Sequence, residues 1–187
     1  MNAAIHWSGP VLVGGALALA LAIMLISSRP VVGQAISSGV AALLLLSAAL
    51  LLLSLPAMYA VQADAVGGMG LVAHALLATG LLLPVVGAAT PLLHPSLDAP
   101  TGEHRLIFVL GIALTLGLLL TGISTLQADV LPRPAAVLLL AATAGFFFVF
   151  FVAEFLPPAA GQIGSVVFGF LLALGFAWIG VALWLRN

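Results

Sequence analysis

One histidine falls well inside an apolar stretch of the chain, and it is the residue there best suited to proton chemistry. His74 has Gly70 and Ala78 four residues away on either side, so the three share one face of a helix. Small residues at this spacing let another helix approach closely and turn the imidazole toward protein rather than lipid. At membrane depth such a ring handles protons or contacts a ligand, or it stays neutral and hydrogen-bonded to a neighbouring helix. We favour the structural role and keep His74 as a candidate ligand contact.

Glu154 is the acid at the edge of an apolar stretch, shortly before two prolines. It comes at the end of its expected helix, whereas His74 comes early in a helix that runs in the same direction. At a rise of about 1.5 Å per residue the two side chains lie roughly 15 to 20 Å apart along the membrane normal, too far for an acid–base pair. Because general acid–base catalysis needs two ionisable groups within reach of one substrate, we predict no catalytic residues. Glu154 is expected to reach water, with a ligand or another subunit as the alternative partner.

Further candidate ligand contacts are one proline and three aromatic residues. Pro84 has no amide hydrogen and leaves the carbonyl of Gly80 free, which predicts a kink that seats a ligand or only shapes the packing. Phe147 and Phe151 belong to a cluster of phenylalanines that could contact a flat apolar molecule, although a surface facing lipid or another subunit is the simpler interpretation. Trp178 has an indole N–H that needs an acceptor.

The longest polar connection, 91–104, holds two imidazoles and two carboxylates, which are ordinary ligands of divalent metals. They belong to His94, Asp98, Glu103 and His104. The histidines are ten residues apart with prolines between them, so no helix holds them at metal-binding spacing. A helix N-cap at Thr101 explains the acid at Glu103 more simply. We therefore predict no metal site. The absence of cysteine also excludes thiolate sites and disulfides, and no cofactor is required.

The elements that carry these residues are expected to lie in a lipid bilayer. The chain has 187 residues, of which 64% are apolar and 5% charged, and it contains no lysine. Its mean hydropathy is +1.37. So few charges cannot coat a surface that faces water. The pattern predicts an all-α polytopic bundle of six transmembrane helices in a single domain, with spans near 10–28, 31–55, 66–90, 105–126, 134–155 and 162–185.

Small residues are expected to hold the helices together. In lipid, apolar side chains gain little by exchanging one apolar neighbour for another, so helices associate where their backbones approach closely. Ala113, Gly117 and Thr121 follow one another at intervals of four and therefore form one small-residue face.

An internal similarity connects two of the expected turns. Gln62, Ala63 and Asp64 recur as Gln127, Ala128 and Asp129, an offset of 65 residues (127 minus 62). The offset predicts a parallel repeat of two helix hairpins. The alternative is that two helix ends in an alanine-rich and leucine-rich chain arrived at similar residues independently.

The same two turns carry a resemblance to known proteins. The segments 55–63, which reads LPAMYAVQA, and 126–138, which reads LQADVLPRPAAVL, resemble a loose group of uncharacterised multi-helix bacterial integral membrane proteins. The resemblance covers the two connections and the general hydropathy. It implies a bacterial membrane protein and assigns no activity and no functional residues.

Three functions are compatible with these features. The first is a non-catalytic subunit or scaffold of a larger membrane complex, bound to other membrane subunits or to copies of itself. The alternative is a carrier or permease for a small, largely apolar molecule, or a binder of a flat apolar ligand such as a quinone, carotenoid or lipid. A membrane enzyme acting on lipid comes third. The formal net charge of −1 argues against nucleic acid as a partner.

Membrane orientation depends on very few arginines. Arg133 and Arg186 are expected on the same side as the terminal amine, and Arg29 and Arg105 on the other side. The positive-inside rule then favours a multi-pass protein of the cell membrane with both termini in the cytoplasm.

Overall fold

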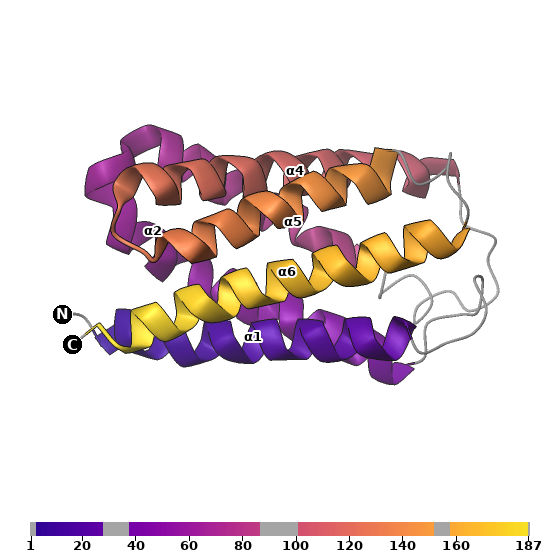
Figure 1. Ribbon diagram of the computed structural model, residues 1–187, viewed down its shortest axis with the longest axis horizontal. Helices are drawn as coiled ribbons and strands as arrows, with labels where there is room; N and C mark the ends of the chain where they lie inside the picture. The colour runs from indigo at the N-terminus through magenta and orange to yellow at the C-terminus, as the bar shows by residue number, and fades with distance from the viewer. Residues whose placement is uncertain (1–2, 28–37, 87–100, 152–157, 187) are drawn as a thin grey trace.

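The computed structural model describes residues 3–27, 38–86, 101–151 and 158–186, and within these ranges every regular element is a helix (Figure 1). The helices are α1 (Ala3–Ser27), α2 (Ser38–Gly80), α4 (Thr101–Ala128), α5 (Arg133–Phe151) and α6 (Pro158–Trp184). The all-α class is therefore confirmed. Among the residues that the structure describes, residues of the second and third predicted spans belong to one element, α2, which is broken at Gly67, so six separate helices are not confirmed.

The helix α2 continues past the point where the sequence predicted its end. Pro56 lies inside the helix, and the helical backbone persists until Gly67, where φ is 50° and ψ is −138°. A proline removes one helical hydrogen bond and bends a helix without always ending it. A residue at positive φ leaves the helical path altogether, and glycine is the residue that adopts this conformation at little cost. The break therefore falls at Gly67, just after the connection 56–65 that the predicted spans left between them.

After Gly67 the helix α2 folds back on itself. The ring centroids of Tyr59 and His74 lie 5.5 Å apart. In an unbroken helix these residues would be about 22 Å apart. The parts of α2 before and after Gly67 therefore pack side by side as a hairpin. The parallel repeat of two hairpins stays a prediction.

Each helix packs against two others, and the pairs close into a ring. The pairs are α1 with α2, α2 with α4, α4 with α5, α5 with α6, and α6 with α1. Gly9 of α1 packs against Gly180 of α6, and Gly169 of α6 packs against Ile23 of α1, so these two helices are antiparallel. The start of α1 and the end of α6 consequently lie at the same end of the bundle, as Figure 1 shows.

Glycines bring α2 and α4 into close contact. A Cβ atom added to Gly117 would clash with the backbone of Leu77, and one added to Gly80 would clash with the backbone of Leu114. Gly117 is the centre of the small-residue face predicted from the sequence. Two separate contacts of this kind fix the register of the later part of α2 against α4.

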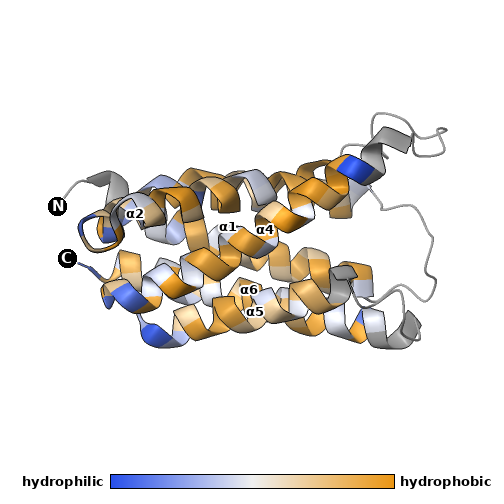
Figure 2. Cartoon of the chain, turned by 90° about the horizontal axis from the view of Figure 1, so that it is seen from above, coloured by the Kyte–Doolittle hydropathy of each residue, from blue (hydrophilic) through white to orange (hydrophobic). Residues whose placement is uncertain are grey.

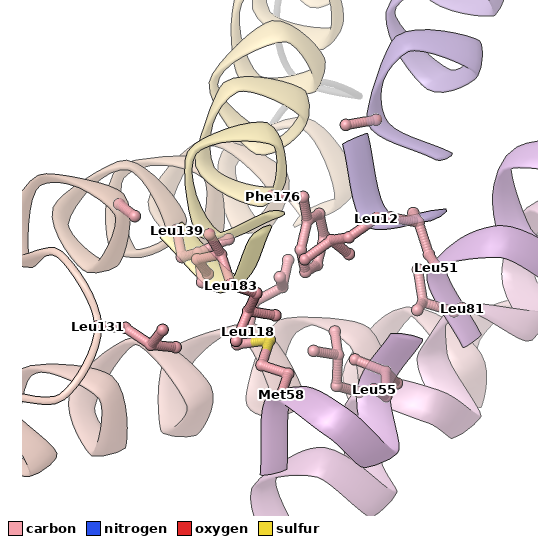
Figure 3. Packing of buried hydrophobic residues seen from close by; sticks show 14 of the residues in the cluster. Leu12, Leu51, Leu55, Met58, Leu81, Leu118, Leu131, Leu139, Phe176 and Leu183 are labelled. Carbon is pink, nitrogen blue, oxygen red and sulfur yellow. The ribbon is translucent and has the colours of Figure 1, made fainter. Parts of the chain in front are cut away.

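The interior of the ring is filled by large apolar side chains. Met58, Leu118 and Leu183 come from three different helices and meet in the centre of the view in Figure 3. Leu139 and Phe176 extend this layer toward α5 and α6. All five are fully buried.

The outside of the bundle has the character of a surface that faces lipid. Leu53 is 71% exposed and Ile163 is 64% exposed, and hydrophobic residues cover the helices along their length, with hydrophilic segments at the ends (Figure 2). Within the part of the chain that the structure describes, four helical stretches are long and apolar enough to cross a membrane, namely 6–27, 38–86, 105–128 and 161–184, and α5 contributes a shorter apolar stretch, 133–148. The protein is therefore an integral membrane protein.

Candidate ligand site inside the helix ring

The ring of helices holds a partly open apolar cavity with a volume of about 260 Å³. All five helices contribute to its wall, including Ile23 of α1, Leu51 of α2, Leu118 of α4, Phe146 of α5 and Phe168 of α6. Side chains that are distant in sequence meet here because the ring closes between α1 and α6. The cavity is thus a product of the tertiary fold and not of any local motif.

The chemistry of the wall is almost entirely hydrocarbon. Its polar side chains are Ser47 and Ser165. The hydroxyl of Ser47 donates to the carbonyl of Gly15 at 3.0 Å, and that of Ser165 donates to the carbonyl of Gly161 at 2.9 Å. Both hydroxyl protons are already used within the protein. The cavity is therefore suited to an apolar molecule held by shape and dispersion contacts.

Of the ligand contacts predicted from the sequence, Pro84 lines the cavity. The helix α2 ends at Gly80, and Leu81 forms a turn before helical conformation resumes over 82–86. Pro84 cannot donate a hydrogen bond to the carbonyl of Gly80, which accounts for an interruption at this place. Leu81 and Leu83 line the cavity together with Pro84.

Phe147 and Trp178 do not belong to the cavity wall. Phe147 is 51% exposed and Trp178 is 48% exposed on the outside of the bundle. The phenylalanines on the wall are instead Phe146 and Phe168, which the sequence did not single out. Successive side chains along a helix point about 100° apart, so neighbours in one apolar run can face the cavity and the outside of the bundle.

His74 is buried away from the cavity. It is 5% exposed, and its Nδ1 lies 2.8 Å from the carbonyl oxygen of Gly70, one turn earlier in the same helix. The ring also packs edge-on against Tyr59. Since a carbonyl can only accept, Nδ1 carries a proton and Nε2 of the neutral ring is an acceptor. His74 therefore joins the two arms of α2.

Other predicted positions lie outside the described residues. These are Glu154 and the side chain of Phe151 on the candidate list, and, in the connection considered for metal binding, residues 91–100 with the side chains of Glu103 and His104. Among the residues that the structure describes, no group of three or more histidines and acids is placed to hold a metal ion.

Comparisons with protein-family models, with curated proteins and with solved structures gave no match to this chain. The cavity and the buried polar groups are therefore interpreted from their own geometry.

Proposed function

We propose that this membrane protein binds a small, largely apolar molecule inside its ring of helices. The observation that carries the proposal is the cavity of about 260 Å³ to which every helix contributes. An apolar cavity of about 150 Å³ in another protein is large enough to bind benzene, and pockets for drug-sized ligands start near 300 Å³. The ligand, or the part of it that enters, is therefore the size of a single ring or a short hydrocarbon chain.

Two features of the wall narrow the class of ligand. Phe146 and Phe168 contribute aromatic surfaces from adjacent helices, which favours a ring or an unsaturated chain. The volume accommodates the head ring of a quinone or part of a lipid chain, whereas a whole carotenoid is too large. Of the carrier and binder roles considered from the sequence, binding of such a ligand is therefore the one that the cavity supports.

The role of complex subunit or scaffold stays a second proposal. An exterior of exposed leucine, isoleucine and tryptophan suits partner helices as well as it suits lipid. Native mass spectrometry in mild detergent distinguishes the two, because a subunit retains its partner proteins or further copies of itself. A membrane enzyme is not proposed, since no pair of groups for acid–base catalysis is assigned.

The proposed topology is six crossings in the cell membrane, with α2 crossing twice and both termini in the cytoplasm. The hairpin at Gly67 supports the double crossing. The earlier arm of α2, 38–66, is about 43 Å long, and the later arm followed through the helical residues 82–86 reaches about 28 Å, so each is long enough to cross a hydrocarbon core of about 30 Å.

The binding proposal is tested by filling the cavity. Ala142 is buried in the cavity wall, so Ala142→Leu places three more carbon atoms in the space that a ligand would occupy. Octane added to the detergent-solubilised wild type is expected to raise Tm with a saturable dependence on concentration. In Ala142→Leu that rise should be lost. The matched control is Ala75→Leu, which adds the same atoms at an exposed position of α2 and should keep the full rise.

A second cavity-filling variant keeps the test decisive if Ala142→Leu does not fold. Ala48 lies in the wall on another helix, and Ala48→Val adds two carbon atoms there. An octane-dependent rise in Tm that is the same in wild type and in both filled variants would exclude this cavity as the binding site.

A further inference from the structure

Four buried polar atoms have no hydrogen-bond partner among the residues that the structure describes. They are Oε1 of Gln62, Nε2 of His74, and Oγ1 of both Thr121 and Thr125. The four side chains are at most 5% exposed. In a membrane interior such atoms cannot turn to bulk water, so an unpartnered one is unfavourable. We refer to these four residues as the polar cluster.

The helix register brings Thr121 to the level of His74. Gly117 lies beside Leu77 in the antiparallel packing of α4 against the later arm of α2. One turn farther along α4 is Thr121, and one turn back along α2 is Ala73, the neighbour of His74. Thr125 lies about 6 Å beyond Thr121 along the helix axis.

Gln62 reaches the same level from the earlier arm of α2. The ring contact between Tyr59 and His74 fixes how the two arms lie against each other. Gln62 is about 4.5 Å nearer the break at Gly67 than Tyr59 is, and therefore falls between the levels of Thr121 and Thr125. Three helical segments thus place the four polar residues within about 8 Å of one another along the bundle axis.

On α4 the polar cluster begins about one helix turn beyond the wall of the cavity. Along α4 the buried residues Leu114, Leu118, Thr121 and Thr125 follow at intervals of three or four, so they form one stripe facing the interior. Leu114 and Leu118 line the cavity. The step from Leu118 to Thr121 is about 4.5 Å along the helix.

The arms of α2 repeat this order. The earlier arm leads from Leu51 on the cavity wall through Leu55 and Met58 to Gln62, at intervals of three or four. In the later arm, Leu81 lines the wall, Leu77 lies four residues before it, and His74 lies three residues before Leu77. Each of the three segments, read away from the cavity, has a residue of the cavity wall first, then a buried leucine or methionine, and then a polar residue of the cluster.

The hydrogen-bonding capacity of the cluster matches a hydroxyl group. Nε2 of His74 is an acceptor, because Nδ1 donates to the carbonyl of Gly70. The amide nitrogen of Gln62 donates to the carbonyl of Met58 at 3.3 Å, which leaves Oε1 as an acceptor. The threonine hydroxyls both donate and accept. A hydroxyl placed among them can donate to Nε2 or Oε1 and accept from a threonine.

We propose that the polar cluster binds the hydroxyl group of a ligand whose hydrocarbon part occupies the cavity. The ligand is thus an alcohol with an apolar chain or ring, an inference that rests on the proposed binding function and specifies its substrate class. Such a ligand requires Leu77 and Leu118, whose side chains are fully buried between the cavity and the polar cluster, to change rotamer.

The experiment compares octanol with octane, which differ by the hydroxyl group. Apparent affinity is obtained from the dependence of Tm on ligand concentration in one detergent. In the wild type octanol should bind about three- to tenfold more tightly than octane, the effect of one net hydrogen bond. Thr121→Val, which removes the hydroxyl and keeps the side-chain shape, should bring the two affinities together and leave octane binding unchanged. Thr125→Val makes the same prediction if Thr121→Val fails to fold.

The matched control is Thr115→Val. Thr115 is buried on the same helix, but its hydroxyl already donates to the carbonyl of Gly111 at 2.8 Å. This variant should keep the preference for octanol. Equal affinities for octanol and octane in the wild type, or a preference that survives in Thr121→Val and Thr125→Val, would overturn the hydroxyl site. Failure of both compounds to raise Tm would instead overturn the proposed cavity function.

Discussion

At the scale of single residues, hydroxyl side chains make two kinds of hydrogen bond in this bundle. Ser54 and Thr143 donate to carbonyls three or four residues earlier in their own helices, at distances of 2.8 to 2.9 Å. Ser47 donates instead to the carbonyl of Gly15 on α1, at 3.0 Å. Hydrogen bonds within a helix satisfy the hydroxyl without joining two elements. The bond of Ser47 joins α2 to α1 and therefore contributes directly to helix association.

Ser47→Ala is therefore expected to lower the free energy of unfolding by about 0.6 kcal/mol and at most about 1.7 kcal/mol, the range measured for hydrogen bonds between membrane helices. The measurement is unfolding by denaturing detergent in mixed micelles. The matched control is Ser54→Ala, which removes a buried hydroxyl from the same helix and should change stability much less. A larger loss in Ser54→Ala would show that the contact between Ser47 and Gly15 does not stabilise the pair of helices.

The site residues illustrate what single positions reveal in advance. Pro84 was predictable, because a proline in an apolar helix disturbs the backbone wherever the helix packs. The choice between Phe146 and Phe147 was not, because the residues around them are apolar apart from Thr143 and periodicity marks no inner face. Gln62 was noticed only as part of a turn, since its burial depends on the two arms of α2 folding together.

At the scale of elements, the hairpin of α2 depends on one backbone conformation. Gly67 has a positive φ, and a Cβ atom added there would meet no neighbouring atom within 4 Å. Any penalty for a side chain at this position is therefore backbone strain and not a clash. The neighbouring Gly68 also has open space around it and lies in regular helix.

Gly67→Ala should destabilise the protein by about 1 to 3 kcal/mol, the usual cost of a strained backbone conformation. Gly68→Ala should be neutral or stabilising by up to about 1 kcal/mol, since alanine is the better helix former. Tm in mild detergent, followed by tryptophan fluorescence, compares the two variants. Equal Tm values would contradict a turn that requires glycine at position 67.

At the scale of the whole molecule, closure of the ring determines which connections share a membrane surface. The start of α1, the end of α6 and the turn 129–132 between α4 and α5 lie at one end of the bundle (Figure 1). In the same region Arg133 pairs with Asp129 at 2.9 Å, and the guanidinium of Arg186 donates to the carbonyl of Val130. Arg186, near the chain end, is thereby joined to that turn.

Topology reporters should therefore place the C-terminus and an insertion in the turn 129–132 on the same side of the membrane. An insertion at the opposite end of α4, directly before Thr101, should report the other side. The measurement is accessibility of the inserted tag to a reagent that cannot cross the membrane, in sealed vesicles. A C-terminus and a 129–132 tag on opposite sides would contradict the ring as described.

The sequence by itself determined that this is a helical membrane protein, because hydropathy summed over about 20 residues decides whether a segment prefers lipid to water. It also identified Gly117 as a place of close helix contact, because a face of small residues four apart can be recognised within a single helix. The connection expected at 56–65 is helical in the structure and the break comes at Gly67, because a proline bends a helix whereas a glycine at positive φ leaves the helical path. Only the tertiary structure decided which faces of uniformly apolar helices turn inward. That choice depends on how six helical segments fit together, and it alone creates the cavity and the polar cluster beside it.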